Sequence, residues 1–200
     1  MGGGAGLKIG VLALQGDFSL HARAIARCGA QAVEVRKPEQ LAELDGLIIP
    51  GGESTTLLNH MRDEPWFEAL RRFHAEGGVL LGTCAGAILL AREVRPPQKS
   101  LGLLDAVVER NAYGRQVDSF QARVEAPALG GAVDGVFIRA PRLRAVGPET
   151  EVLARHEGEP VMVRQGRVVA TTFHPELTVS RAVHRYTLGL AERGEERRTA

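Results

Sequence analysis

A cysteine between two glycines, at the junction of two apolar segments, constrains the fold of this chain more than any other feature. Cys84 lies in Gly82-Thr83-Cys84-Ala85-Gly86. An apolar run typical of a buried strand precedes it (Gly78-Val79-Leu80-Leu81), and a helical one follows (Ala87-Ile88-Leu89-Leu90-Ala91). A sharp strand-to-helix turn of this kind lifts one side chain above a sheet. The segment therefore predicts a nucleophile at a strand end in an α/β fold.

Strands and helices alternate through the first half of the chain. Apolar runs predict buried strands over residues 7–14, 32–35, 46–50 and 78–81. Helices are expected from about Phe18 to Arg27, from Glu53-Ser54-Thr55 onward, and from Pro65 to Glu76. This alternation predicts a three-layer, doubly wound, mixed but mainly parallel sheet with helices on both faces.

The second half is rich in β-forming residues. Strands are expected over residues 106–110, 117–124, 136–138, 152–156, 160–164 and 168–173, with hairpin turns at Glu157-Gly158 and Gln165-Gly166 and a loop over residues 95–100. We expect a partly antiparallel continuation of the sheet and a last helix from about Ser180 to Glu192. Residues 1–200 are expected to form a single domain, with flexible ends at 1–6 and 194–200.

Composition excludes several classes of protein. A net charge of +1 over 200 residues leaves no electrostatic footprint for nucleic acid or anionic lipid. There is no apolar run of roughly 20 residues that would span a bilayer, and the glycine-rich start lacks the features of a signal peptide, so we expect a cytoplasmic protein. No phosphate-loop or dinucleotide fingerprint is present. His21, His60, His74, His156 and His184 lack metal-ligand spacing, so we expect no metal.

The segment His174-Pro175-Glu176 completes a set of groups suited to acyl transfer. Residues at i and i+2 of an extended chain lie on the same side, so Glu176 can orient His174. A helix N-terminus favours the thiolate of Cys84, and His174 can take its proton. The amide of Ala85, and one in Gly51-Gly52, are candidates for an oxyanion hole. The sequence therefore predicts a cysteine amidase with the triad Cys84, His174 and Glu176.

Each of these segments has a simpler interpretation when it is taken alone. The glycines around Cys84 can serve a tight packing corner, and His174-Pro175-Glu176 can be a turn at a strand end. Gly51-Gly52-Glu53-Ser54-Thr55 can be a glycine turn with Ser54 or Thr55 as a helix N-cap. In open α/β sheets ligands bind at the carboxyl ends of strands, where the loop after Leu14, Gly51-Gly52-Glu53-Ser54 and the turn at Cys84 are expected. Together with His174-Pro175-Glu176, these segments favour catalysis.

Longer segments resemble a known family. In the order of Cys84, His174 and Glu176 the chain resembles the class I glutamine amidotransferases, which have a flavodoxin-like fold. From about Lys8 to Ala191 it is more narrowly similar to the glutaminase subunits of pyridoxal 5'-phosphate synthase. The likeness rests on Gly10-Val11-Leu12-Ala13-Leu14-Gln15-Gly16, Pro50-Gly51-Gly52-Glu53-Ser54-Thr55-Thr56, Gly82-Thr83-Cys84-Ala85-Gly86, Val108-Glu109-Arg110-Asn111, Gly114-Arg115-Gln116-Val117-Asp118-Ser119-Phe120, Phe137-Ile138-Arg139-Ala140-Pro141 and His174-Pro175-Glu176-Leu177-Thr178.

The resemblance implies hydrolysis of glutamine to glutamate and ammonia through a thioester on Cys84. By the same resemblance, the residues that hold L-glutamine are Gly51, Gly52, Glu53, Ser54, Arg110, Ile138 and Arg139. Chemistry agrees in part, since an arginine and a glutamate complement the α-carboxylate and α-ammonium groups of glutamine. Sequence alone does not distinguish Arg110 and Arg139 from other arginines, which are commonly solvated or paired at a surface.

A partner is implied as well. Members of this family pass ammonia to a barrel-shaped synthase subunit that builds pyridoxal phosphate from a pentose phosphate and a triose phosphate. They are nearly inactive without it, because docking completes the oxyanion hole. Gln15 follows the first strand, near the predicted triad, and is our candidate for coupling to the partner. The chain is expected to need no cofactor of its own.

Three other functions share parts of this pattern. A class I glutaminase that serves another synthase has the same triad and differs in the partner it responds to. A cysteine peptidase or chaperone of the flavodoxin-like group resembles the fold and the turn at Cys84, but has no need of the glutamine-binding segments. A non-catalytic glutamine sensor has no use for a poised thiolate.

Overall fold

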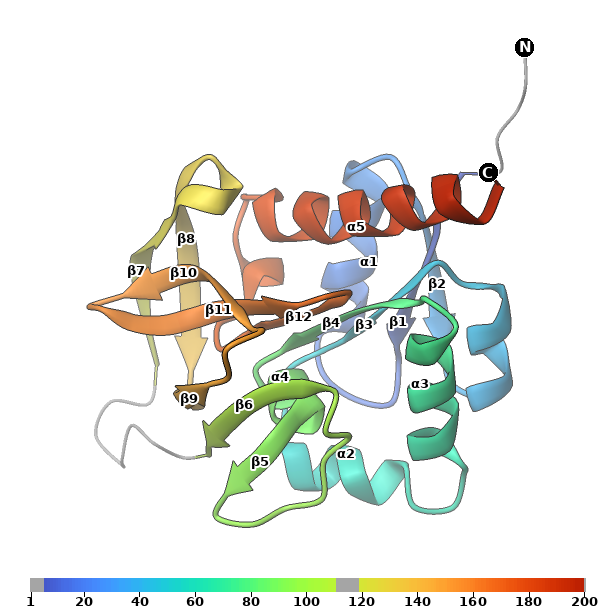
Figure 1. Ribbon diagram of the computed structural model, residues 1–200, viewed down its shortest axis with the longest axis horizontal. Coiled ribbons are helices and arrows are strands. Elements are labelled where there is room, and N and C mark those ends of the chain that lie inside the picture. The colour runs from blue at the N-terminus through green and yellow to red at the C-terminus, as the bar shows by residue number, and fades with distance from the viewer. Residues whose placement is uncertain (1–5, 111–118, 200) are drawn as a thin grey trace.

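A nine-stranded sheet organises the computed structural model, in which residues 6–110 and 119–199 are described (Figure 1). Its strand order is β2-β1-β3-β4-β12-β11-β10-β7-β8. The parallel part contains β1 (Lys8–Leu12), β2 (Gln31–Val35), β3 (Gly46–Ile49), β4 (Val79–Thr83) and β12 (Val168–Thr171). The antiparallel part adds β11 (Glu159–Gln165), β10 (Glu151–His156), β7 (Ser119–Ala126) and β8 (Gly131–Ile138). Both predicted hairpins are present.

Helices cover both faces of this sheet (Figure 1). One face carries α1 (Phe18–Arg27) and α5 (Ala182–Thr199), and the other carries α2 (Ser54–His60), α3 (Trp66–Ala75) and α4 (Ala85–Leu90). Alternation along β4 fits this layering, since Val79 and Leu81 pack with α1 and α5, whereas Leu80 packs with α2, α3 and α4. Short 3-10 turns lie at η1 (Pro38–Glu43), η2 (Pro127–Leu129) and η3 (Pro175–Leu177). The predicted three-layer fold is confirmed.

A smaller sheet was not expected from the sequence. It has the order β5-β6-β9, with strands at Ala91–Arg95, Leu104–Glu109 and Arg142–Val146. The first strand begins directly after α4, without a turn residue to mark the change, so the predicted helix ran one residue too far, to Ala91. The last has a single buried residue, Leu143, and so gives no periodic signal. Helix α5 also continues beyond the predicted end at Glu192.

The pairing of β12 with β4 determines which loops meet. Thr171 is in register with Thr83, and the amide of Cys84 donates a hydrogen bond of 2.9 Å to the carbonyl oxygen of Thr171. Strand β3 flanks β4 on its other side, with Ile49 in register with Gly82. The turns that follow β3, β4 and β12 therefore lie side by side at one edge of the sheet.

Two buried histidines link the helices on one face of the sheet. Nδ1 of His21, on α1, lies 2.9 Å from Nε2 of His184, on α5, and both side chains are fully buried. Burial, and next the proximity of His184 and His174, lowers the pKa of His21 well below 6.5. Burial lowers the pKa of His184 to about 4. Both imidazoles are therefore neutral in the folded protein near neutral pH.

Acid should destabilise the fold through this pair. The stability associated with the two neutral imidazoles is fully present above about pH 6.5 and is lost as the pH falls toward about 4, because only the unfolded chain takes up their protons. Each histidine contributes a slope of about 1.4 kcal/mol per pH unit in that interval. Replacing one of them, as in His184→Leu, should remove the contribution of one proton, so the unfolding free energy should change with pH by about 1.4 kcal/mol less per pH unit. Urea unfolding at a series of pH values measures this, and equal slopes for both proteins would contradict it.

Candidate active site

Cys84 occupies a strained turn between β4 and α4. Its φ is +48° and its ψ is −102°, and the residue is buried, with 5% of its surface exposed. A positive φ is unfavourable for a residue with a side chain, and such strain is common at functional sites. The sulfur lies 4.0 Å from the carbonyl oxygen of Ile138, at the end of β8. The predicted strand-to-helix turn is therefore present.

The glycines on either side of Cys84 are required by close packing. A Cβ atom on Gly86 would lie 2.1 Å from the carbonyl oxygen of Ile49, in β3. One on Gly82 would lie 2.5 Å from the carbonyl carbon of Gly86. Because both neighbours are backbone atoms, neither can move aside cheaply. The tight packing corner and the strand-to-helix turn that carries Cys84 are thus one structure.

His174 and Glu176 lie beside Cys84 in the order that the triad requires. Nδ1 of His174 is 2.8 Å from Oε1 of Glu176, whose side chain is only 1% exposed. A carboxylate is an acceptor, so Nδ1 carries the proton in this contact, and Nε2 is free to exchange a proton with the thiol of Cys84. The i, i+2 spacing noted in the sequence therefore brings the two side chains together, although Glu176 lies in η3 and not in an extended strand.

The pKa of His174 reflects these contacts. Burial lowers the pKa, but the hydrogen bonds with Cys84 and Glu176 outweigh it and raise the pKa of His174 to about 10. His174 is therefore protonated at neutral pH when the sulfur beside it is a thiolate. An ion pair of imidazolium and thiolate is the reactive form of a catalytic cysteine.

The segment after β3 packs directly against the triad. A Cβ atom on Gly51 would lie 2.3 Å from Cε1 of His174 and 3.1 Å from Cβ of Cys84. Gly52 has a φ of +136°, and a Cβ atom there would lie 2.9 Å from the side-chain amide nitrogen of Gln15. The backbone thus approaches the reacting groups at residue 51, and Gln15 at residue 52, more closely than a residue with a side chain would allow.

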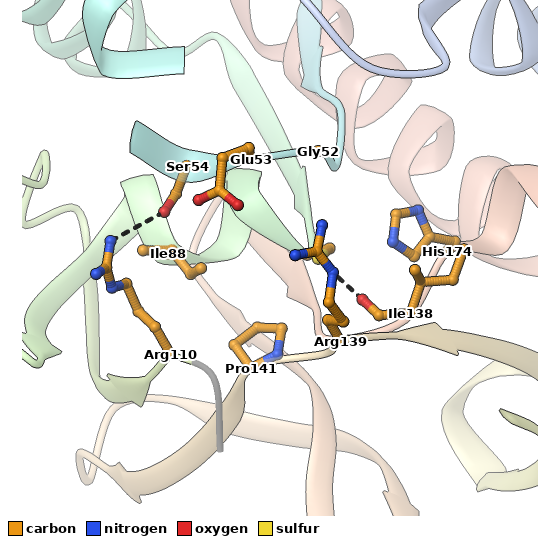
Figure 2. A pocket seen from close by; sticks show the side chains of 10 residues that line it. Gly52, Glu53, Ser54, Ile88, Arg110, Ile138, Arg139, Pro141 and His174 are labelled. Atoms are coloured by element: carbon orange, nitrogen blue, oxygen red, sulfur yellow. Dashed lines mark hydrogen bonds between the residues drawn. The ribbon is translucent and has the colours of Figure 1, made fainter. Parts of the chain in front are cut away.

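Ten residues line a pocket in front of Cys84 (Figure 2). They are Gly52, Glu53, Ser54, Cys84, Ile88, Arg110, Ile138, Arg139, Pro141 and His174. Figure 2 shows Ser54 and Arg110 at one end of the pocket and His174 at the other, with the side chain of Arg139 between them. The structure thus brings the predicted glutamine-binding residues together. Gly51 lies behind them against His174, and Ala85 begins α4 next to Cys84, with its first-turn amide.

Two lining residues at the distal end of the pocket, Ser54 and Arg110, are held by a residue outside the lining that the sequence did not single out. Gln98 Oε1 accepts hydrogen bonds from Nη1 of Arg110 and, at 2.9 Å, from the hydroxyl of Ser54. Arg110 Nη1 also lies 3.4 Å from that hydroxyl. No pattern in the loop over residues 95–100 marked Gln98, and Ile88 and Pro141 were likewise recognisable only as apolar or turn residues.

The suggested N-cap role of Ser54 or Thr55 is wrong, because α2 begins at Ser54 and its N-cap is Glu53.

One segment that supports the family resemblance cannot be placed in the structure, and two kinds of feature are absent from the described residues. Residues 111 and 114–118 of the family-specific segment lie outside the described residues. Within residues 6–110 and 119–199, no cluster of three or more His, Cys, Asp or Glu side chains has the arrangement of a metal site. In the same residues, no helix is both long enough and apolar enough to pass through a membrane.

Known proteins are similar to this chain over most of its length. Residues 11–191 match the model of the SNO glutamine amidotransferase family. The chain is 52% identical over 188 residues to pyridoxal 5'-phosphate synthase subunit PdxT of Desulforudis audaxviator, covering 93% of this chain and 100% of that protein. It is 55% identical over 186 residues to the subunit of the same name from Thermus thermophilus, covering 92% and 97%.

A solved structure is similar as well. The crystal structure of a glutamine amidotransferase superimposes with a TM-score of 0.87 at 53% sequence identity, and the match covers 92% of this chain and 98% of that one. The family match, the close relatives and the similar structure all indicate the same family. This chain belongs to the SNO glutamine amidotransferase family.

Proposed function

We propose that this chain hydrolyses L-glutamine to L-glutamate and ammonia through a thioester on Cys84, and supplies the ammonia to the synthase subunit of pyridoxal 5'-phosphate synthase. The observation that carries the proposal is the position of Cys84, paired with a protonated His174, at one end of a pocket whose other end holds Arg110. The relatives that share half of its sequence are named as subunits of that synthase.

In the first half-reaction, the thiolate of Cys84 attacks the side-chain amide carbon of glutamine. The carbonyl oxygen becomes an oxyanion, for which the amides of Ala85 and Gly52 are the proposed donors. His174, which holds a proton near neutral pH, donates it to the leaving nitrogen as the carbon–nitrogen bond breaks. Ammonia departs and a γ-glutamyl thioester is left on Cys84.

In the second half-reaction, neutral His174 accepts a proton from water, which attacks the thioester carbon. The same oxyanion hole stabilises the second tetrahedral intermediate. Collapse of that intermediate breaks the carbon–sulfur bond, releases glutamate and restores the pair of thiolate and imidazolium. Glu176 keeps the proton on Nδ1 of His174 in both halves, so that Nε2 always faces the reacting atoms.

The amino acid end of glutamine fits the opposite end of the pocket. We assign its α-carboxylate to Arg110, with the hydroxyl of Ser54, and its α-ammonium to Glu53. Gln98 accepts hydrogen bonds from Arg110 and Ser54 and so holds both donors in place. Arg139 and Ile138 border the middle of the pocket and complete the contacts with the substrate.

Arg110→Gln tests this orientation. The loss of a charge-assisted hydrogen bond should raise KM for glutamine by roughly 10- to 100-fold and change kcat less, because the contact is made before and during the reaction. Steady-state kinetics of glutamate release measure both constants. Arg92→Gln, which removes an exposed arginine paired with Asp105, serves as the matched control and should leave both constants unchanged. An unchanged KM in Arg110→Gln would contradict the assignment.

Gln15 is our candidate for coupling to the synthase subunit. Its side-chain amide lies against Gly52, and a Cβ atom on the neighbouring Gly16 would lie only 2.0 Å from the carbonyl oxygen of Gly51. The loop after β1 is therefore in contact with the segment that provides the proposed oxyanion donor. A partner that moves this loop would change the orientation of that donor.

The cytoplasmic location expected from the sequence stays a prediction.

Glutamate release should depend on Cys84 and rise sharply when the synthase subunit is added. Cys84→Ala should abolish it, and Gln15→Ala should reduce the response to the partner while glutamine binding persists. The measurement is glutamate release with and without the synthase subunit, for the natural chain and both variants. A rate of glutamate release that does not change when the synthase subunit is added would indicate that the chain serves a different synthase. No turnover in either condition would contradict the proposed hydrolysis, and full activity of Gln15→Ala would contradict the coupling.

A further inference from the structure

The carboxylate of Glu176 has a second neighbour that lies outside the triad. Its Oε1 atom accepts the hydrogen bond from His174, whereas Oε2 lies 3.3 Å from Nε2 of His21. The side chain of His21 is fully buried and that of Glu176 is 1% exposed, so water does not compete for this contact. Within the described residues, no group meets the geometry of a hydrogen bond to Oε2, so the contact with His21 is a close approach of two polar atoms. Such contacts are often long without substrate and tighten when it binds.

The surroundings of His21 fix where its proton lies. A bare Nε2 atom facing a buried carboxylate oxygen would be repelled, so Nε2 carries the proton and points toward Glu176. The hydroxyl of Thr83, 3.5 Å from the same nitrogen, provides a second acceptor. Nδ1 of His21 is then an acceptor, and Nε2 of His184 donates to it across 2.9 Å.

His184 is the last group in this series of polar contacts. With its proton on Nε2, its Nδ1 atom carries only a lone pair, which agrees with the absence of a hydrogen-bond partner for that atom in the described structure. Because both histidines are neutral near neutral pH, the polar groups run from His184 through His21 to Glu176 without placing a second positive charge beside the carboxylate.

We infer that His21, oriented by His184, is a positioning residue that holds the Glu176 carboxylate in the orientation required for the triad. This inference rests on the proposed thiol chemistry at Cys84 and extends it. A carboxylate with a nitrogen facing each of its oxygens keeps Oε1 directed at Nδ1 of His174. If Oε2 loses the facing donor, the buried carboxylate is free to rotate away from Nδ1 of His174. That rotation weakens the support of Glu176 for the imidazolium of His174.

The groups that face Glu176 from the neighbouring elements define the expected pH dependence. Among the described residues, these are His174 at the start of η3 and His21 from α1, with Cys84 beyond His174 and His184 from α5 beyond His21. Removal of the donor at His21 should move the acid limb of Cys84 reactivity to higher pH, because an imidazolium that Glu176 supports less well stabilises the neighbouring thiolate less.

The experiment measures the rate at which iodoacetamide alkylates Cys84 as a function of pH. All variants also carry Cys28→Ser, so that only one thiol can react. His21→Leu removes the donor, and His21→Gln places an amide donor near the position of Nε2. We expect His21→Leu to slow alkylation by about 10-fold or more near pH 6 and to shift the acid limb upward. His21→Gln should recover most of the rate, and His184→Leu should show a smaller shift in the same direction.

Ile25→Val is the matched control, because Ile25 lies one turn further along α1 and is fully buried. It should lower the Tm slightly without moving the pH profile. A His21→Leu profile that superimposes on that of the background protein would overturn the inference, as would a His21→Gln variant as impaired as His21→Leu. Alkylation requires neither glutamine nor the synthase subunit, so this result is independent of whether the proposed hydrolysis holds.

Discussion

The parallel pairing of β12 with β4 is the constraint on which the site depends. These strands are far apart in the sequence, and the register that places Thr171 opposite Thr83 brings the residues after each strand to the same edge of the sheet. Cys84 and His174 meet for that reason, and β3 on the other side of β4 brings Gly51 into contact with both. The antiparallel strands β11, β10, β7 and β8 extend the sheet. The carbonyl oxygen of Ile138, at the end of β8, lies near the sulfur of Cys84. The pairings on both sides of β4 thus assemble a site from separate segments of the chain.

A buried carboxylate is the electrostatic centre of this arrangement. Glu176 is removed from water and is stable there only because polar groups face it. On one side, His174 is charged and is held so by the carboxylate and the sulfur. On the other side, His21 and His184 remain neutral, since burial disfavours their charged forms. One negative charge therefore supports one imidazolium, and the neutral histidines add orientation without competing for it.

Local patterns in the sequence predicted much of the fold and of the reacting groups. Cys84 and the parallel half of the sheet were predictable because apolar runs, glycine turns and helix periodicity are local signals. His174 and Glu176 were predictable because they are neighbours in one short segment. Strands β5 and β9 lack such signals, since one follows α4 without a break and the other has only Leu143 buried. Gln98 and His21 become functional candidates only through contacts with distant residues, which no local pattern records.

The most direct test of the account is covalent labelling with an electrophilic chloroketone analogue of glutamine, followed by mass mapping of the modified peptide. One adduct is expected, on Cys84, and excess glutamine should slow its formation because the analogue and glutamine occupy the same pocket. Labelling of Cys28 instead, or labelling of Cys84 without protection by glutamine, would contradict the claim that this pocket presents glutamine to the Cys84 thiolate.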